Sequence, residues 1–81
     1  MDALITMFNE LRATRPPIYD GDKWPIWEDQ ISQVIANMPT RDQRWASVML
    51  LADDLSQSLP GMPKVVAFLR IQDAVLRAGC R

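Results

Sequence analysis

Apolar side chains recur along this chain at intervals of three and four residues, the spacing of one face of an α-helix. Prolines and turn residues divide this pattern into four segments, at residues 3–15, 25–38, 41–59 and 63–77. No segment alternates apolar and polar residues in the manner of a strand. The pattern predicts an all-α fold, a single domain over residues 1–81, built as a small bundle of about four helices with a longer first loop at residues 18–25.

Residues at the ends of the segments support these boundaries. Pro16 and Pro17 cannot continue the first helix, because proline lacks an amide donor and restricts the residue before it. Thr40 and Gln43 have the spacing of a capping box, in which each side chain bonds to the backbone amide of the other residue. Gly79 follows the last helix where a left-handed cap is common, so the sequence predicts both ends of most helices.

The third segment contains five consecutive apolar residues, at positions 48–52. Five neighbouring residues wrap around more than one face of a helix, which is typical of a helix buried on several sides. We therefore expect this segment to be the central helix of the bundle.

The fourth segment has two apolar faces, and a small bundle can cover only one of them. With 48% hydrophobic residues in 81, the chain has more apolar surface than one small core encloses. Surplus apolar surface marks protein interfaces, so we expect a homodimer that uses one face of this helix. Val65, Leu69, Gln72 and Leu76 form one face, and Phe68, Ile71, Val75 and Ala78 form the other. The sequence leaves open which face is the interface, and the candidate residues are Phe68, Leu69, Ile71, Val75 and Leu76.

Aromatic residues cluster around the first loop. The helical pattern places Trp27 and Trp45 in the core, whereas Tyr19 and Trp24 lie in the predicted loop. An exposed aromatic side chain in a loop can anchor a partner protein, although a lid over the core explains the same residues. Tyr19 and Trp24 are therefore candidate partner anchors.

The same residues resemble a known motif. Tyr19, Asp20 and Gly21, followed by Trp24 and Trp27, are similar to the aromatic-Asp-Gly-x-x-aromatic-x-x-Trp signature that opens the capsid region of copia-type retroelement Gag proteins. The resemblance implies a loop leading into a capsid helix, with Trp27 packed in the core. A Gag-like fragment for capsid assembly is accordingly one alternative function.

Residues for catalysis or metal binding are scarce. The chain has no histidine and one cysteine, Cys80, so it has neither the usual base for a cysteine nucleophile nor a tetrahedral zinc site. Asp20 and Asp22 resemble the start of a calcium loop, but Ile31 stands where that loop needs glutamate. We expect no catalytic residues, no cofactor and no metal, and hence no enzyme.

The charge balance argues against nucleic acid and membranes as partners. Nine basic and ten acidic side chains give a net charge of −1, and no stretch approaches the about 20 apolar residues of a membrane span. One feature favours DNA: Arg41, Gln43 and Arg44 begin a helix after a short turn, as in the recognition helix of a helix-turn-helix regulator. That regulator is the second alternative function.

Taken together, these patterns predict a small helical protein–protein interaction module. We interpret it as a regulator or inhibitor that binds and occupies the surface of another protein, of the kind that phages and mobile elements encode. A single cysteine in so small a chain favours a reducing compartment, so we expect a cytoplasmic protein.

Overall fold

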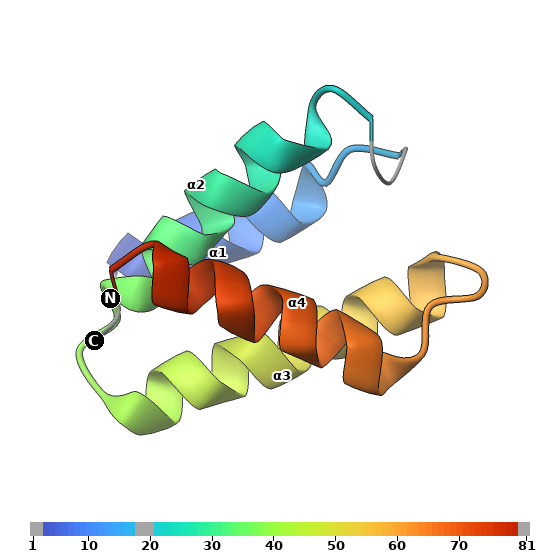
Figure 1. Cartoon of the computed structure of the whole chain (residues 1–81). Coiled ribbons are helices and arrows are strands. Elements are labelled where there is room, and N and C mark those ends of the chain that lie inside the picture. Colours follow the sequence, from blue (N-terminus) through green and yellow to red (C-terminus); the bar gives the residue numbers. More distant parts are fainter. Residues whose placement is uncertain (1–2, 18–20, 80–81) are drawn as a thin grey trace.

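The computed structural model describes residues 3–17 and 21–79, and within them it contains four helices and no strand (Figure 1). The helices are α1 (Ala3–Ala13), α2 (Trp24–Ala36), α3 (Arg41–Ser58) and α4 (Lys64–Arg77). Their ends lie within two residues of the predicted ones. The predicted all-α fold is confirmed.

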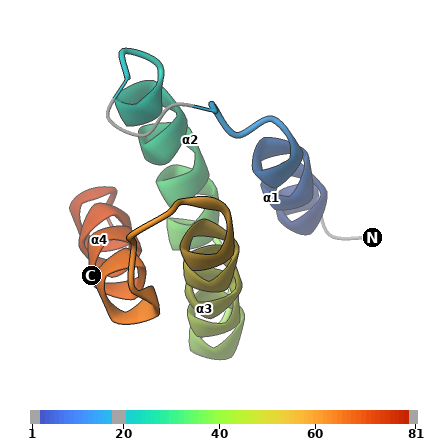
Figure 2. The same ribbon diagram turned by 90° about the vertical axis from the view of Figure 1, so that its right-hand side faces the viewer.

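The helices form two antiparallel pairs that pack on each other. Figure 1 shows α2 running back along α1, and α4 running back along α3. Seen from the end in Figure 2, α2, α3 and α4 surround a common core, and α1 lies against α2 on the outer side. Of the four helices, α2 packs against all three others, extensively against α1 and α4 and less against α3. The central helix is therefore α2, and the prediction that the third segment would be central was wrong.

The predicted central position of the third segment rested on the apolar run at positions 48–52, and this run is only partly buried. Val48, Leu51 and Ala52 enter the core, but Met49 and Leu50 are exposed on α3. In α2 the apolar residues instead cover a wide arc of one side, which α1, α3 and α4 enclose between them. The buried apolar residues of α2 are Trp24, Trp27, Ile31, Val34 and Ile35.

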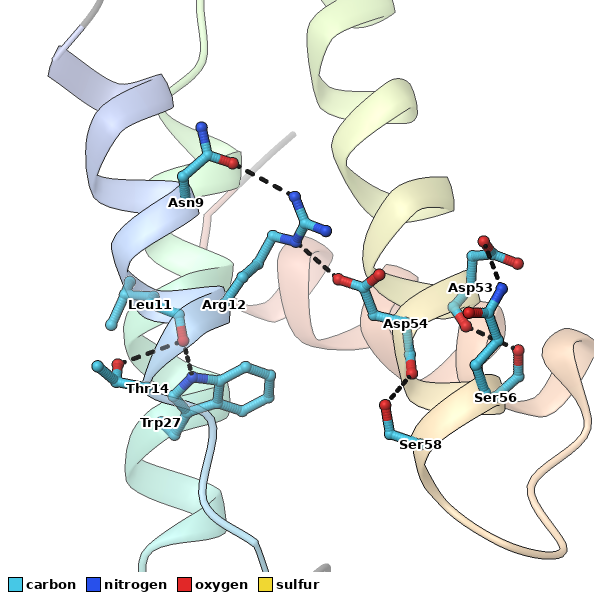
Figure 3. A network of polar contacts seen from close by, with 10 residues as sticks. Asn9, Leu11, Arg12, Thr14, Trp27, Asp53, Asp54, Ser56 and Ser58 are labelled. Carbon is cyan, nitrogen blue, oxygen red and sulfur yellow. Dashed lines mark hydrogen bonds and ion pairs between the residues drawn. The ribbon is translucent and has the colours of Figure 1, made fainter.

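Two polar contacts hold α1 to the rest of the bundle (Figure 3). The indole nitrogen Nε1 of Trp27 donates to the backbone oxygen of Leu11 at 2.8 Å, near the C-terminal end of α1. Arg12 crosses to α3, where its Nε donates to a carboxylate oxygen of Asp54 at 2.7 Å. These bonds fix the position of a helix that buries only Phe8 completely.

Local signals at the helix ends behave as expected. The Thr40 hydroxyl accepts from the Gln43 amide at 3.1 Å, and the Gln43 side chain accepts from the Thr40 amide at 3.4 Å, so the predicted capping box is confirmed. Gly79 has the positive φ, +111°, that its predicted role as a cap requires. Gly61, in the turn between α3 and α4, also has a positive φ of +79°. Both positions therefore favour glycine.

The core predicts a large difference between two isoleucines of α2. Ile31 is fully buried and Ile26 is 63% exposed. Ile31→Ala should lower the free energy of unfolding by about 2–5 kcal/mol because it leaves a cavity, and the milder Ile31→Val by about 0.5–1.5 kcal/mol. Ile26→Ala is the matched control and should stay within about 0.5 kcal/mol. Urea unfolding followed by circular dichroism measures all three, and equal effects at the two positions would contradict this core.

A buried hydroxyl in α2 allows a stabilising substitution. Ser32 is buried, and its hydroxyl has no hydrogen-bond partner among the described residues. Ser32→Ala should raise the free energy of unfolding by about 1 kcal/mol, because it removes the unsatisfied group and favours the helix. Ser58→Ala is the control, since the exposed Ser58 hydroxyl donates to the Asp54 backbone oxygen at 2.6 Å. A lower stability of Ser32→Ala would show that the hydroxyl is satisfied in solution.

Candidate protein-interaction surface

The structure decides which face of α4 turns inward. Ile71 is fully buried and Val75 nearly so, whereas Leu69 is 55% and Leu76 56% exposed. Ile71 and Val75, predicted as interface candidates, are therefore corrected to core residues of the bundle itself. Phe68 is half-buried at the border between the two faces.

Small side chains explain why that face of α4 is the inner one. Ala67 and Ala74 flank Ile71 at helical spacing, and both are buried. Alanines allow α4 to approach its neighbours closely, so Ile71 can fill the space between the helices. The opposite face has Gln72 at its middle, and burying an amide without partners is unfavourable. In the sequence, Ala67 and Ala74 carry this signal, whereas the large apolar residues alone do not distinguish the two faces.

The exposed side of α3 adds two large apolar side chains beside α4. Trp45 is 37% exposed, and Met49, one turn further along α3, is also exposed. The Trp45 ring stacks on Phe68 of α4, with ring centroids 5.4 Å apart and planes 17° apart. The prediction that Trp45 would be a core residue was wrong, because Phe68 covers one side of the ring and leaves the rest accessible.

These side chains form one surface, which we call the α3–α4 face. It is defined by exposed or half-buried residues of two antiparallel helices, namely Trp45 and Met49 of α3 and Val65, Phe68, Leu69, Gln72 and Leu76 of α4. Five of the nine large apolar residues that are exposed in the described structure belong to it. Exposed apolar residues elsewhere, such as Ile26 on α2, are more scattered.

A hollow of about 380 Å³ lies at one end of the α3–α4 face. Its lining combines apolar side chains with two arginines and comprises Arg41, Arg44, Trp45, Val48, Gln72, Val75 and Leu76. The Arg44 guanidinium donates to the backbone oxygen of Met38 at 2.8 Å, which holds it at the rim. Arg41 is exposed and pairs with no carboxylate in the described part of the chain.

The opposite end of the α3–α4 face carries a carboxylate. Asp53 of α3 lies 3.5 Å from the Lys64 ammonium of α4 and accepts from Gln57 at 3.1 Å. Figure 3 shows Asp53 beside Asp54, near the C-terminal end of α3. This carboxylate is partly exposed, so it can take a further cationic partner.

A larger hollow, of about 570 Å³, lies between α1 and α2. Its lining is mixed and comprises Leu4, Met7, Glu10, Leu11, Thr14, Gln30, Gln33, Val34 and Asn37. Met7 is the one large apolar side chain among these that is exposed. An interface requires accessible apolar area, which makes the α3–α4 face the stronger candidate.

The two predicted partner anchors have different outcomes. Trp24 is 2% exposed, packs against Trp27 with ring centroids 4.9 Å apart, and donates from Nε1 to Glu28 at 3.2 Å. Its role as an exposed anchor is therefore corrected, because the first turn of α2 places it in the core. Tyr19 lies outside the described residues, as does Cys80.

The residues that favour DNA binding in the sequence, Arg41, Gln43 and Arg44, lie beside a largely apolar surface of α3. Gln43 is engaged in the capping box, while Arg41 and Arg44 line the hollow. Beyond them, the exposed side of α3 continues with Trp45, Met49 and Leu50 rather than with groups that bind phosphate.

Clusters of metal ligands and membrane-spanning helices are absent from the described ranges. There, no group of three or more His, Cys, Asp or Glu side chains is placed to hold a metal ion. None of the four helices has the length and apolar character needed to cross a membrane. Comparison with known proteins gives no match to a family model, a curated protein or a solved structure.

The two faces of α4 predict opposite effects of the same substitution. Ile71→Glu buries a carboxylate without a partner and should abolish the cooperative helical fold. Leu69→Glu, two residues away and exposed, should keep the helical spectrum and cooperative unfolding. Circular dichroism in dilute solution compares the variants. A folded Ile71→Glu variant would mean that α4 has the other orientation.

Proposed function

We propose that this chain is a helical protein–protein interaction module, not an enzyme, and that it forms a homodimer through the α3–α4 face. The observation that carries the proposal is the gathering of five large exposed apolar side chains on that face: Trp45, Met49, Val65, Leu69 and Leu76. Contiguous exposed apolar surface marks interfaces, and a tryptophan at its centre is the residue type that most often dominates binding.

Energetics support pairing of these surfaces. Burying apolar surface contributes about 25 cal/mol per Å² removed from water, and each of these side chains has a substantial fraction still exposed. A two-fold dimer buries every such side chain twice, once in each copy. A methionine and a tryptophan on the face also adapt well to an opposing surface.

A regulatory or inhibitory role is part of the proposal. A module of this kind acts by occupying a surface of another protein, which needs shape and apolar complementarity rather than reactive groups. The single cysteine supports an intracellular setting. An origin in a phage or mobile element, and the Gag-like alternative, stay predictions. The helix-turn-helix alternative is less favoured because the accessible side of α3 is mainly apolar.

Sedimentation tests the homodimer directly. The unmodified chain should sediment as a dimer at about 100 μM, a concentration well above micromolar dissociation constants. Leu69→Glu should sediment as a folded monomer at the same concentration, because it places two carboxylates in the apolar interface.

The matched control for this experiment is Ile26→Glu. Ile26 is an exposed isoleucine of α2 and lies outside the α3–α4 face. This variant should remain a dimer. A monomeric unmodified chain would refute the homodimer, and equal dissociation of both variants would refute the assignment of the face.

A further inference from the structure

Both ends of the α3–α4 face carry charged side chains. At one end Arg41 and Arg44 line the hollow, and at the other Asp53 is partly exposed beside Lys64. Arg41 is exposed and pairs with no carboxylate in the ranges that the structure describes. A surface with a basic end and an acidic group at the other end can complement itself when it is reversed.

The distances along the two helices agree with such a reversal. Arg41 and Asp53 are twelve residues apart on α3, which corresponds to about 18 Å. Val65 and Leu76 are eleven residues apart on α4, which corresponds to about 16 Å. The distance between the two charged groups of α3 is therefore nearly the same as the distance between the outermost apolar residues of the face on α4.

The midpoints of these two stretches also lie level with each other. The midpoint of the α3 stretch is position 47, and the midpoint of the α4 stretch lies between positions 70 and 71. Trp45 lies within three residues of the first midpoint and Phe68 within three residues of the second, and these two side chains stack on each other. Arg41 and Leu76 share the hollow at one end, and Asp53 contacts Lys64 at the other. One two-fold axis can therefore serve both helices.

Two-fold symmetry allows two ways of laying this face on a second copy with the helices aligned. An axis along the helices brings like ends together and gathers the Arg41 and Arg44 side chains of both copies at one end. An axis across the helices brings unlike ends together, so that Arg41 of each copy lies opposite Asp53 of the other. Repulsion among four guanidinium groups disfavours the first arrangement, and attraction favours the second.

We infer that the dimer is antiparallel, with α3 on α3 and α4 on α4 of the second copy, joined at each end by an ion pair between Arg41 and Asp53. This inference rests on the proposed homodimer and specifies its arrangement. It also places the exposed Val65 of each copy opposite Leu76 and the hollow of the other. Leu69 then lies opposite Gln72, and Asp53 is shared between Lys64 of its own chain and Arg41 of the second copy.

A charge exchange between two variants tests this arrangement. Arg41→Glu places like charges together at both ends of the dimer, and Asp53→Arg does the same with the opposite sign. Both variants should fold, because glutamate suits the first turn of α3 and arginine suits its C-terminal part. Sedimentation equilibrium at low ionic strength should show the dimer dissociation constant raised about tenfold for each variant alone.

Mixing the two variants should restore pairing. In the mixed dimer, Glu at position 41 of one copy faces Arg at position 53 of the other, and at the second end the native Asp53 faces the native Arg41. Its dissociation constant should lie within about twofold of that of the unmodified chain. A fluorescent label on one variant distinguishes mixed dimers from the two self-paired forms.

The remaining outcomes separate this inference from the proposed function. If neither variant weakens a dimer that Leu69→Glu abolishes, the face pairs but the antiparallel arrangement is wrong. If each variant weakens the dimer and mixing does not restore it, the charges do not meet across the interface and the inference again fails. If the unmodified chain is a monomer, the proposed homodimer and this inference fail together.

Discussion

The packing of α2 against three neighbours is the constraint on which the rest of the structure depends. Its buried side includes two tryptophans and three β-branched residues, which together are too wide for any one helix to cover. The α1 helix closes one edge through the Trp27–Leu11 bond, while α3 and α4 close the remainder. Each of the other helices is placed by its contact with α2 and thus has one side committed to the core.

This commitment explains why the α3–α4 face is left uncovered. Among the helices of residues 3–17 and 21–79, α1 lies outside the group formed by α2, α3 and α4 and packs over α2 (Figure 2). No other helix of the described residues covers the outer sides of α3 and α4, which carry the exposed Trp45, Leu69 and Leu76. Five of the nine large apolar side chains that are exposed in the described residues therefore gather on these outer sides.

Charge has a different role from apolar area in the proposed assembly. The apolar residues supply the driving force but allow several arrangements of two faces, because apolar contact is not directional. Arg41 and Asp53 lie at opposite ends of the face, so their ion pairs favour one arrangement over the others. Their contribution to the free energy of dimerisation is modest. The same division of roles holds inside the molecule, where the Arg12–Asp54 pair fixes the position of α1 while Phe8 and partly buried apolar residues of α1 pack against the core.

The sequence by itself determined the helices, because caps, prolines and helical periodicity are local signals; Thr40 with Gln43 and Gly79 behave as predicted. It also determined that α4 has two apolar faces, since both follow from spacing along one helix. Only the tertiary structure decided that Ile71 and Val75 turn inward, that α2 rather than α3 is central, and that Trp24 is buried while Trp45 is partly exposed. The physical reason is that burial depends on which neighbours are close enough to exclude water from a side chain. The position of those neighbours is set by the packing of all four helices together, which periodicity within a single segment does not contain.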